Sequence, residues 1–275
     1  MSTYEEYVLA RTSAEYQRLR IQAKLWEATT MRVLQQAGLS VGMRCLDVGC
    51  GPGEVMRLMG ETVGSGGHVT GVDVDGKIGQ EALDVLQANS DSQFVFLETD
   101  VEKTDEMPGA PFDLVFARLT LIHMKDPAAE LRKMAQWTKP GGIVVVQDFD
   151  LRTWDTYPPH ATTVEAIQLI SKVMAAGGFD IHLGFRLPQY FVDAGLGMPD
   201  GTDVSGLLTG FEVVGRMTQA VYNNIFPVAE KFGLADEAQR QTVMASIDDV
   251  IAAETHTASS PLLVGAWKRK PADSQ

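Results

Sequence analysis

The sequence is poor in cysteine and in positive charge. Only two cysteines, Cys45 and Cys50, occur in 275 residues, too few for a disulfide framework or a four-ligand zinc site. Lys and Arg number 23 against 36 Asp and Glu, a formal net charge of −13 at pH 7. Because nucleic acids and anionic membranes are bound largely through Lys and Arg, we expect neither as a partner. The acidity by itself indicates little more than solubility.

Long apolar segments are also missing. No apolar run approaches the ~18–20 residues of a membrane-spanning helix. The first seven residues, Met-Ser-Thr-Tyr-Glu-Glu-Tyr, have neither the basic nor the apolar part of a signal peptide. We therefore expect a cytoplasmic protein. A hydrophobic content of 45% is enough for a packed core.

Helix and strand patterns alternate in the first half of the chain. Apolar spacing predicts helices over residues 14–37, 55–62, 80–88 and 127–137, the last with Asp126 as N-cap. Strands are predicted over residues 44–48, 68–73, 94–97, 112–117 and 143–146, with a turn at 139–142. This alternation indicates an α/β fold with a doubly wound parallel sheet. Farther on, residues 151–200 show no clear strand, 211–253 indicate two helices, and 261–267 a last strand.

A glycine-rich loop follows the first predicted strand. In doubly wound folds the ligand binds at the carboxyl ends of the strands, where Gly49, Gly51 and Gly53 fall. A dinucleotide fingerprint would need a glycine at position 54, which is Glu54, and Pro52 lacks an N–H for a pyrophosphate. The loop therefore favours a ligand that has a ribose and no phosphate.

Acidic residues follow three of the strands. Asp73 can accept hydrogen bonds from ribose hydroxyls, Asp100 can accept one from an adenine amino group, and Asp47 can offset a ligand ammonium. The alternative for Asp47 and Asp100 is a role in a turn or a helix cap.

These motifs together resemble the class I S-adenosylmethionine-dependent methyltransferases. The likeness covers residues 14–150 and rests on five segments in order: 46–53, 71–73, 100–101, 112–123 and 139–142. It implies a Rossmann-like, mostly parallel seven-stranded sheet, with N-terminal helices and a helical or loop lid insertion after the fifth strand. The implied segments are N-terminal lid helices (1–40), a cofactor-binding core (41–150), an acceptor-binding insertion (151–230), and a C-terminal helix and strand completing the core (231–275).

The resemblance also implies roles for single residues toward S-adenosylmethionine. Gly49 and Gly51 would approach its methionine part, with Arg118 beneath through its backbone carbonyl. Asp73, with Val74 beside it, would hold the ribose, and Asp100 and Val101 the adenine. The stretch from Glu15 to Gln22 looks like the lid helix of members that act on small molecules, which places Tyr16 and Gln22 near the cofactor. An ordinary amphipathic helix is the alternative.

The acceptor side has weaker signals. His123, just beyond the fourth strand, is the candidate general base, since an ordinary histidine titrates near neutral pH, although a packing role is the alternative. Asp148, after the fifth strand, could contact substrate or act as a base, and a capping or solvated role is the alternative. The aromatic residues of the insertion are expected to line an apolar acceptor pocket or to form the core of a lid; they include Trp154, Tyr157, Phe179 and Phe185.

The favoured function is therefore methyl transfer to a hydrophobic small molecule, such as an aromatic or isoprenoid metabolite, at carbon, oxygen or nitrogen. One alternative keeps the cofactor but couples methylation to cyclisation or rearrangement, and another is a non-catalytic cofactor-binding module. No metal site is expected. The chain could also form a homo-oligomer. The N-terminal segment, with Tyr4, Tyr7 and Leu9, could dock on its own lid or on a neighbouring subunit.

Overall fold

A computed structural model describes residues 13–272, with side chains from residue 18 onward. The described chain forms two compact units. The sheet unit comprises residues 19–148, 183–204 and 264–272, and the helical unit comprises residues 13–18, 149–182 and 205–263. Tyr4, Tyr7 and Leu9 lie outside the described residues. Among the residues described, no helix is long and apolar enough to cross a membrane.

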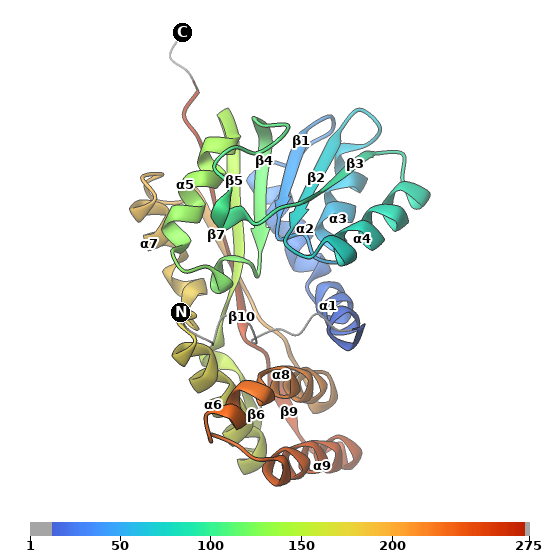
Figure 1. Cartoon of the computed structure of the whole chain (residues 1–275), viewed down its shortest axis with the longest axis vertical. Helices are drawn as coiled ribbons and strands as arrows, with labels where there is room; N and C mark the ends of the chain where they lie inside the picture. Colours follow the sequence, from blue (N-terminus) through green and yellow to red (C-terminus); the bar gives the residue numbers. More distant parts are fainter. Residues whose placement is uncertain (1–12, 273–275) are drawn as a thin grey trace. The chain divides into compact units, whose positions relative to one another are not determined.

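The sheet unit is built on a seven-stranded sheet of order β3-β2-β1-β4-β5-β10-β7 (Figure 1). Its first five strands pair in parallel along that order. The bounds of the seven strands are β1 Arg44–Val48, β2 His68–Asp73, β3 Gln93–Glu98, β4 Phe112–Arg118, β5 Thr138–Asp150, β7 Gly201–Ser205 and β10 Leu262–Arg269. The mostly parallel seven-stranded sheet with flanking helices confirms the predicted fold class.

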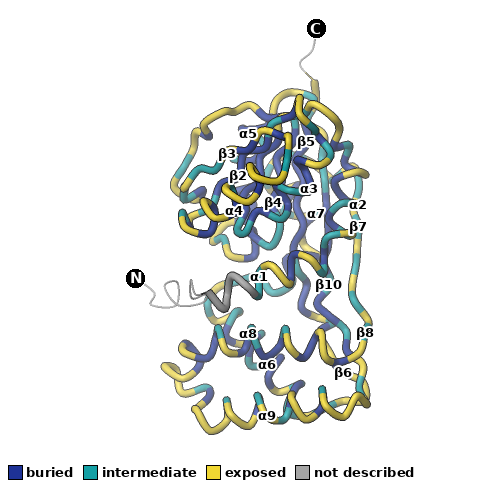
Figure 2. The backbone as a smooth tube through the Cα atoms, turned by 90° about the vertical axis from the view of Figure 1, so that its right-hand side faces the viewer, coloured by how far each residue is buried: buried dark blue, intermediate teal, exposed yellow. Residues whose placement is uncertain are grey.

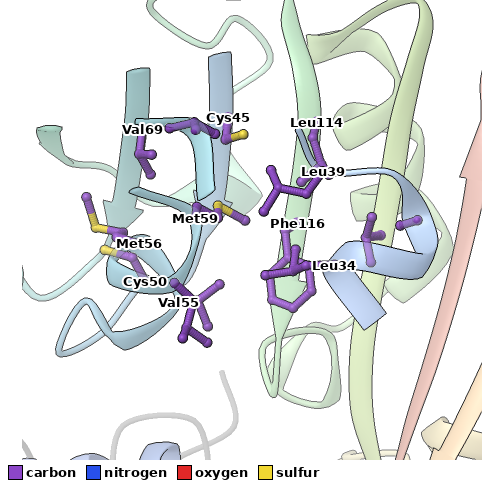
Figure 3. Packing of buried hydrophobic residues seen from close by; sticks show 14 of the residues in the cluster. Leu34, Leu39, Cys45, Cys50, Val55, Met56, Met59, Val69, Leu114 and Phe116 are labelled. Atoms are coloured by element: carbon purple, nitrogen blue, oxygen red, sulfur yellow. The ribbon is translucent and has the colours of Figure 1, made fainter. Parts of the chain in front are cut away.

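Helices flank this sheet. Residues of α2, α3 and α4 pack on one face in a buried cluster, where Leu34 and Phe116 meet (Figure 3). Another helix, α5, packs on β4 and also contacts α7. The helices have the bounds α1 Ser13–Leu25, α2 Glu27–Ala37, α3 Glu54–Val63, α4 Gly76–Asn89, α5 Pro127–Trp137 and α7 Leu183–Asp193.

The helical unit has its own core. Three helices, α6 (Ala161–Ala176), α8 (Phe211–Lys231) and α9 (Glu237–Ala253), bury side chains such as Ile170 and Tyr222, while other residues along each helix stay exposed (Figure 2). A small antiparallel sheet accompanies them, with β9 (Thr257–Ser259) between β6 (Asp155–Tyr157) and β8 (Leu208–Gly210).

Three local expectations were wrong. The helix expected over 14–37 is interrupted at Trp26, a buried corner at which α2 begins, and the apolar spacing simply continues across the break. Residues 139–142 are a bulge inside β5 rather than a turn, because the register with β4 shifts between Phe112 and Leu114. Residues 151–200 contain β6, whose three residues are too short to show a period.

Residues 183–204 also differ in their setting from the sequence expectation, which put them in the acceptor-binding insertion. They belong to the sheet unit, because α7 packs on α5 and β7 extends the seven-stranded sheet. Elsewhere the N-cap prediction is confirmed, since the Asp126 carboxylate accepts the N–H of Ala129 at 2.9 Å, with Pro127 in the first turn.

Replacing Leu34 by Ala should destabilise the sheet unit. Leu34 is fully buried against the sheet, so its truncation leaves a cavity, and we expect a loss of roughly 2–5 kcal/mol in the free energy of unfolding. Chemical denaturation measures this. The control is Val41→Ala, at a side chain 80% exposed, which should change stability by less than about 0.5 kcal/mol. Equal effects of the two substitutions would contradict this placement of α2.

Candidate functional site

The glycine loop after β1 is tightly packed at its ends and open at its middle. Gly49, Gly51 and Gly53 have φ of 71°, 47° and 78°, in the left-handed region that favours glycine. A Cβ at Gly49 would collide with the Thr120 side chain, and one at Gly53 would lie 2.8 Å from the Ala82 Cβ of α4. A Cβ at Gly51 would meet no atom within 4 Å. The middle of the loop can thus receive a ligand against its backbone.

Asp73, at the end of β2, is bonded to this loop. Its carboxylate accepts the N–H of Gly51 at 2.8 Å and that of Asp75 at 2.9 Å. Because these bonds fix the orientation of the carboxylate, the loop and the end of β2 form one rigid edge. Val74 follows with its side chain 50% exposed, an apolar surface next to an acid. This pairing suits a sugar ring with an adjoining base.

The third strand ends differently. The Asp100 carboxylate accepts the N–H of Glu102 at 3.1 Å and the Nζ of Lys103 at 2.6 Å, and the bond from Lys103 holds the pKa of Asp100 below its usual value. Asp100 therefore has the cap role that the sequence left as its alternative. Val101 is buried, and its carbonyl accepts Nζ of Lys133 at 2.8 Å. Their contacts with adenine stay a prediction.

Asp47 is the buried acid of the site. It is 1% exposed, and its Oδ2 has no hydrogen-bond partner within the described part of the chain. Burial raises the pKa of Asp47 to about 7; the charge of Arg118 opposes this rise, the charge of Asp73 adds to it, and the N–H of Met56 opposes it. An unpaired buried carboxylate oxygen fits a cationic ligand group and would repel a phosphate.

Arg118, at the end of β4, supplies the opposing charge. Its Nη1 donates to Oγ1 of Thr30 on α2 at 2.9 Å. Burial lowers the pKa of Arg118, and the charges of Asp47 and Glu54 raise it. The Arg118 carbonyl, expected from the resemblance to lie under the cofactor, accepts the Thr120 hydroxyl at 3.1 Å. Both ends of this residue are therefore held in place.

The segment carrying His123 is anchored from two sides. His123 is exposed at the end of the short helix η2 (Leu121–His123), and its N–H donates to the carbonyl of Thr120 at 3.0 Å. The N–H of Ile122 donates to Oδ2 of Asp148 at 3.0 Å. Asp148 is 0% exposed, and its carboxylate supports the histidine segment, which agrees with the capping alternative; a substrate contact stays a prediction.

The other predicted residues are dispersed. Gln22 on α1 is buried, whereas the Tyr16 side chain lies outside the described side chains. Trp154 is 6% exposed and belongs to the core cluster of the helical unit, which is the lid-core alternative. In the same unit Tyr157 is 75% exposed and Phe179 half-buried. In the sheet unit, Phe185 is 50% exposed.

Two polar residues near the site escaped the sequence analysis. The Thr120 hydroxyl donates to the carbonyls of Val48 and Arg118, both at 3.1 Å, and so joins the ends of β1 and β4. Gln147 is fully buried on β5. Gln147 had a signal in the sequence, since it directly follows the apolar run 143–146, whereas nothing local marks Thr120.

The described part of the chain also shows where potential metal ligands and thiols lie. No group of three or more His, Cys, Asp or Glu is placed there to hold a metal ion. Cys45 and Cys50 are buried and unpaired, and burial raises the pKa of both, which keeps them as thiols. The site therefore consists of backbone, carboxylates, one guanidinium and an exposed histidine.

The chain is similar in sequence to known methyltransferases. The methyltransferase-domain family matches residues 16–192. Phosphoethanolamine N-methyltransferase 1 of Arabidopsis thaliana is 30% identical over 167 residues, which are 61% of this chain and 31% of that protein. The 27-O-demethylrifamycin SV methyltransferase of Amycolatopsis mediterranei is 36% identical over 131 residues, which are 46% of this chain and 47% of that protein. The match thus spans a third to a half of the length of these relatives.

A solved structure shows the same fold over nearly the whole chain. Phosphoethanolamine N-methyltransferase 2 of Haemonchus contortus, in complex with phosphomonomethylethanolamine and S-adenosylhomocysteine, superposes with a TM-score of 0.57. It is 17% identical, and the match covers 98% of this chain and 61% of that one. At this identity the likeness concerns the fold alone.

Substituting Asp47 by Asn should make the ligand-free protein more stable at high pH. The pKa of Asp47 is near 3.8 when unfolded and about 7 when folded, so wild-type stability from this group is full below pH 3.8 and is lost as pH rises through 7. Asn does not titrate. We therefore expect the free energy of unfolding of the variant, relative to that of the wild type, to rise by up to roughly 4 kcal/mol between pH 4 and pH 8.

Denaturation at several pH values measures this gain. The matched control is Asp84→Asn, at an exposed acid of the same unit. A difference between Asp47→Asn and wild type that does not vary with pH would contradict a desolvated carboxylate at this position.

Proposed function

Because the chain belongs to the methyltransferase-domain family, we propose that it is an S-adenosylmethionine-dependent methyltransferase acting on a hydrophobic small molecule. The family match confirms two of the sequence predictions, the class I methyltransferase resemblance and S-adenosylmethionine as cofactor. The observation that supports the activity best is the bond between the Gly51 N–H and the Asp73 carboxylate, which holds an acid beside an open glycine backbone.

The cofactor fits the residues present. Its ammonium would meet the unpaired Oδ2 of Asp47, its ribose hydroxyls would meet Asp73, and its base would lie along Val74 toward Asp100 and Val101. Gly49 and Gly51 let the backbone approach the methionine part closely. A pyrophosphate would instead face the carboxylates of Asp47 and Glu54, with no N–H at Pro52.

When bound, the cofactor supplies a sulfonium methyl, which is already a strong electrophile. The protein then has to bind the acceptor, align it with the methyl and exclude water. His123 is the residue we assign to proton removal, where the acceptor has a proton to lose, because it is exposed beside the cofactor edge on a segment fixed by Asp148.

The proposed acceptor is apolar. Within the sheet unit, the half-exposed aromatic side chain of Phe185 supports this choice, since ligand sites are mostly apolar with a few polar anchors. The relatives named above act on phosphoethanolamine and on a rifamycin. Because like charges repel, a chain of net charge −13 agrees better with an acceptor without phosphate than with a phosphate ester.

The activity is tested by incubating the protein with S-adenosylmethionine and a panel of aromatic and isoprenoid metabolites. We expect formation of S-adenosylhomocysteine together with a product heavier by ~14 Da, the mass of one added methylene, since such pockets are mostly apolar. A product without the methyl from labelled cofactor would favour cyclisation or rearrangement. If the protein binds the cofactor but methylates neither the panel metabolites nor phosphoethanolamine, the non-catalytic module would be favoured.

Replacing Asp73 by Ala should weaken binding of S-adenosylhomocysteine at least about tenfold. The substitution removes the acceptor for ribose hydroxyls, where bonds to a charged group contribute ~1.5–3 kcal/mol each, and also frees the Gly51 N–H. Calorimetric titration measures the affinity, with the exposed Asp84→Ala as control. Unchanged affinity in Asp73→Ala would mean that the ribose lies elsewhere.

Replacing His123 by Ala should lower the turnover number by about 10²–10⁴-fold for an acceptor that loses a proton, with little change in cofactor affinity. The reason is that the imidazole is exposed and its segment is held through the backbone of Thr120 and Ile122. Steady-state kinetics measure the turnover number. The control is Lys125→Ala, at an exposed residue of the same segment. A His123→Ala enzyme with wild-type turnover would make the histidine structural.

A further inference from the structure

His182 is a half-buried histidine of the helical unit that the function described so far does not use. It follows α6 in the chain, and its side chain is 36% exposed. One ring nitrogen, Nδ1, is buried and has no hydrogen-bond partner among the described residues. The other, Nε2, forms no hydrogen bond within the described part of the chain and is not buried. Nε2 is therefore the ring nitrogen that a ligand can reach.

The buried nitrogen faces a carboxylate. Nδ1 of His182 lies 3.6 Å from Oδ1 of Asp150, the last residue of β5, whose side chain is 0% exposed. This separation is slightly longer than a hydrogen bond. Paired groups of a site are often this far apart before a ligand binds. Both residues belong to the helical unit, so the contact lies within one compact body.

Arg152 keeps that carboxylate ionised. Its Nε and Nη2 donate to Oδ1 and Oδ2 of Asp150, each at 2.8 Å, and its backbone N–H donates to Oδ1 at 3.2 Å. Burial alone would raise the pKa of Asp150, but the hydrogen bonds from Arg152 outweigh it and hold the pKa below its usual value. Because an ionised carboxylate only accepts hydrogen bonds, the proton of a neutral His182 belongs on Nδ1. Nε2 then keeps its lone pair.

The backbone holds the histidine in this position. The N–H of His182 donates to Oδ1 of Asp180 at 3.1 Å. The N–H of Leu151, which follows Asp150, donates to the carbonyl of Ile181 at 3.0 Å. The two segments therefore lie side by side where the imidazole meets the carboxylate, and the direction of Nε2 is fixed without a ligand.

Half-buried apolar residues precede both members of the pair. Phe149 comes before Asp150 and Ile181 before His182, and both pack against the core cluster of the helical unit. Phe179, three residues before the histidine, is also half-buried. One polar atom beside apolar side chains is the composition expected of a site for an apolar ligand with a single polar group.

We propose that Nε2 of His182 accepts a hydrogen bond from a hydroxyl group of the molecule that is to be methylated. Asp150 acts through the histidine, because it keeps the proton on Nδ1, and is a positioning residue. The inference rests on the proposed function. It narrows the substrate to apolar molecules that carry a hydroxyl, with phenols as the best match.

This tautomer selects among polar groups. Nε2 without a proton only accepts, so it gains nothing from an ether oxygen or an ionised carboxylate, which have no hydrogen to donate. A phenol joins a donor to a flat apolar ring. Water is the competing partner of an exposed nitrogen, and it limits the preference for a hydroxyl to one net hydrogen bond.

The test compares 2-naphthol with its methyl ether, 2-methoxynaphthalene, by fluorescence titration of the whole chain without cofactor. The two probes have the same aromatic body, and only 2-naphthol can donate to Nε2. Wild type should bind 2-naphthol about three- to tenfold more tightly, the range for one net hydrogen bond. His182→Leu should lose this preference. His182→Gln should keep much of it, because the amide oxygen can accept in place of Nε2.

The matched control is His256→Leu, at another half-buried histidine of the same unit, which should keep the full preference. Equal affinities of wild type for the two probes, or a preference that survives in His182→Leu, would overturn the hydroxyl site. A His182→Gln variant without any preference would also contradict it, since the role of the imidazole would then be structural.

Nitrogen NMR of the histidine rings gives a second readout that needs no binding constant. At about pH 8, where an ordinary imidazole is neutral, the proton of His182 should be on Nδ1. Adding 2-naphthol should shift the Nε2 signal, and 2-methoxynaphthalene should leave it unchanged. A proton on Nε2 in the ligand-free protein would overturn the proposal, because that nitrogen could not accept a hydrogen bond.

The outcomes also separate this site from the proposed function. The naphthol titration uses no cofactor, so its failure would overturn the role of His182 and leave methyl transfer to the metabolite panel as a separate result. Absence of methyl transfer across the panel, with the preference for 2-naphthol intact, would instead overturn the proposed function and support the hydroxyl site alone.

Discussion

The site depends on two opposite charges at the ends of β1 and β4, the buried carboxylate of Asp47 and the half-buried guanidinium of Arg118. Asp47 is almost completely buried, and the charge of Arg118 is the largest influence that keeps its carboxylate ionisable. Burying the Asp47 carboxylate alone would cost several kcal/mol, and the nearby charge of Arg118 offsets part of that cost. A sheet optimised for stability would carry apolar residues here. Strongly perturbed groups placed at the ligand edge of a sheet are typical of functional sites.

The surrounding bonds hold that edge still. Asp73 ties the glycine loop to β2, and the Thr120 hydroxyl ties the end of β1 to the end of β4. Asp148 holds the segment after β4 through the N–H of Ile122. Since methyl transfer needs alignment more than it needs reactive side chains, a rigid edge made of backbone and carboxylates suits it. The exposed His123 on that segment is the residue proposed above to remove a proton from the acceptor.

The sequence was sufficient for the parallel sheet and for the place of the glycine loop because their signals are local. Apolar runs ending in glycine or aspartate indicate parallel strands and a ligand edge, so Gly49, Gly51 and Asp73 could be named in advance. The pairing of Arg118 with Thr30, 88 residues apart, is set by how α2 packs and leaves no local pattern. The three-residue strands β6, β8 and β9 were missed because a period needs more residues. Asp148 was matched to substrate by its position after a strand and Trp154 by its aromatic neighbours in the sequence, and neither signal shows that both side chains are buried.

The central claim is that the loop and its acids bind an adenosyl amino acid and not a dinucleotide. The most direct measurement is a calorimetric titration of the protein with S-adenosylmethionine and, separately, with NADH. We predict saturable binding of S-adenosylmethionine and no binding of NADH, because the carboxylates of Asp47 and Glu54 and the missing N–H of Pro52 disfavour a pyrophosphate. Tight binding of NADH with none of S-adenosylmethionine would contradict the account.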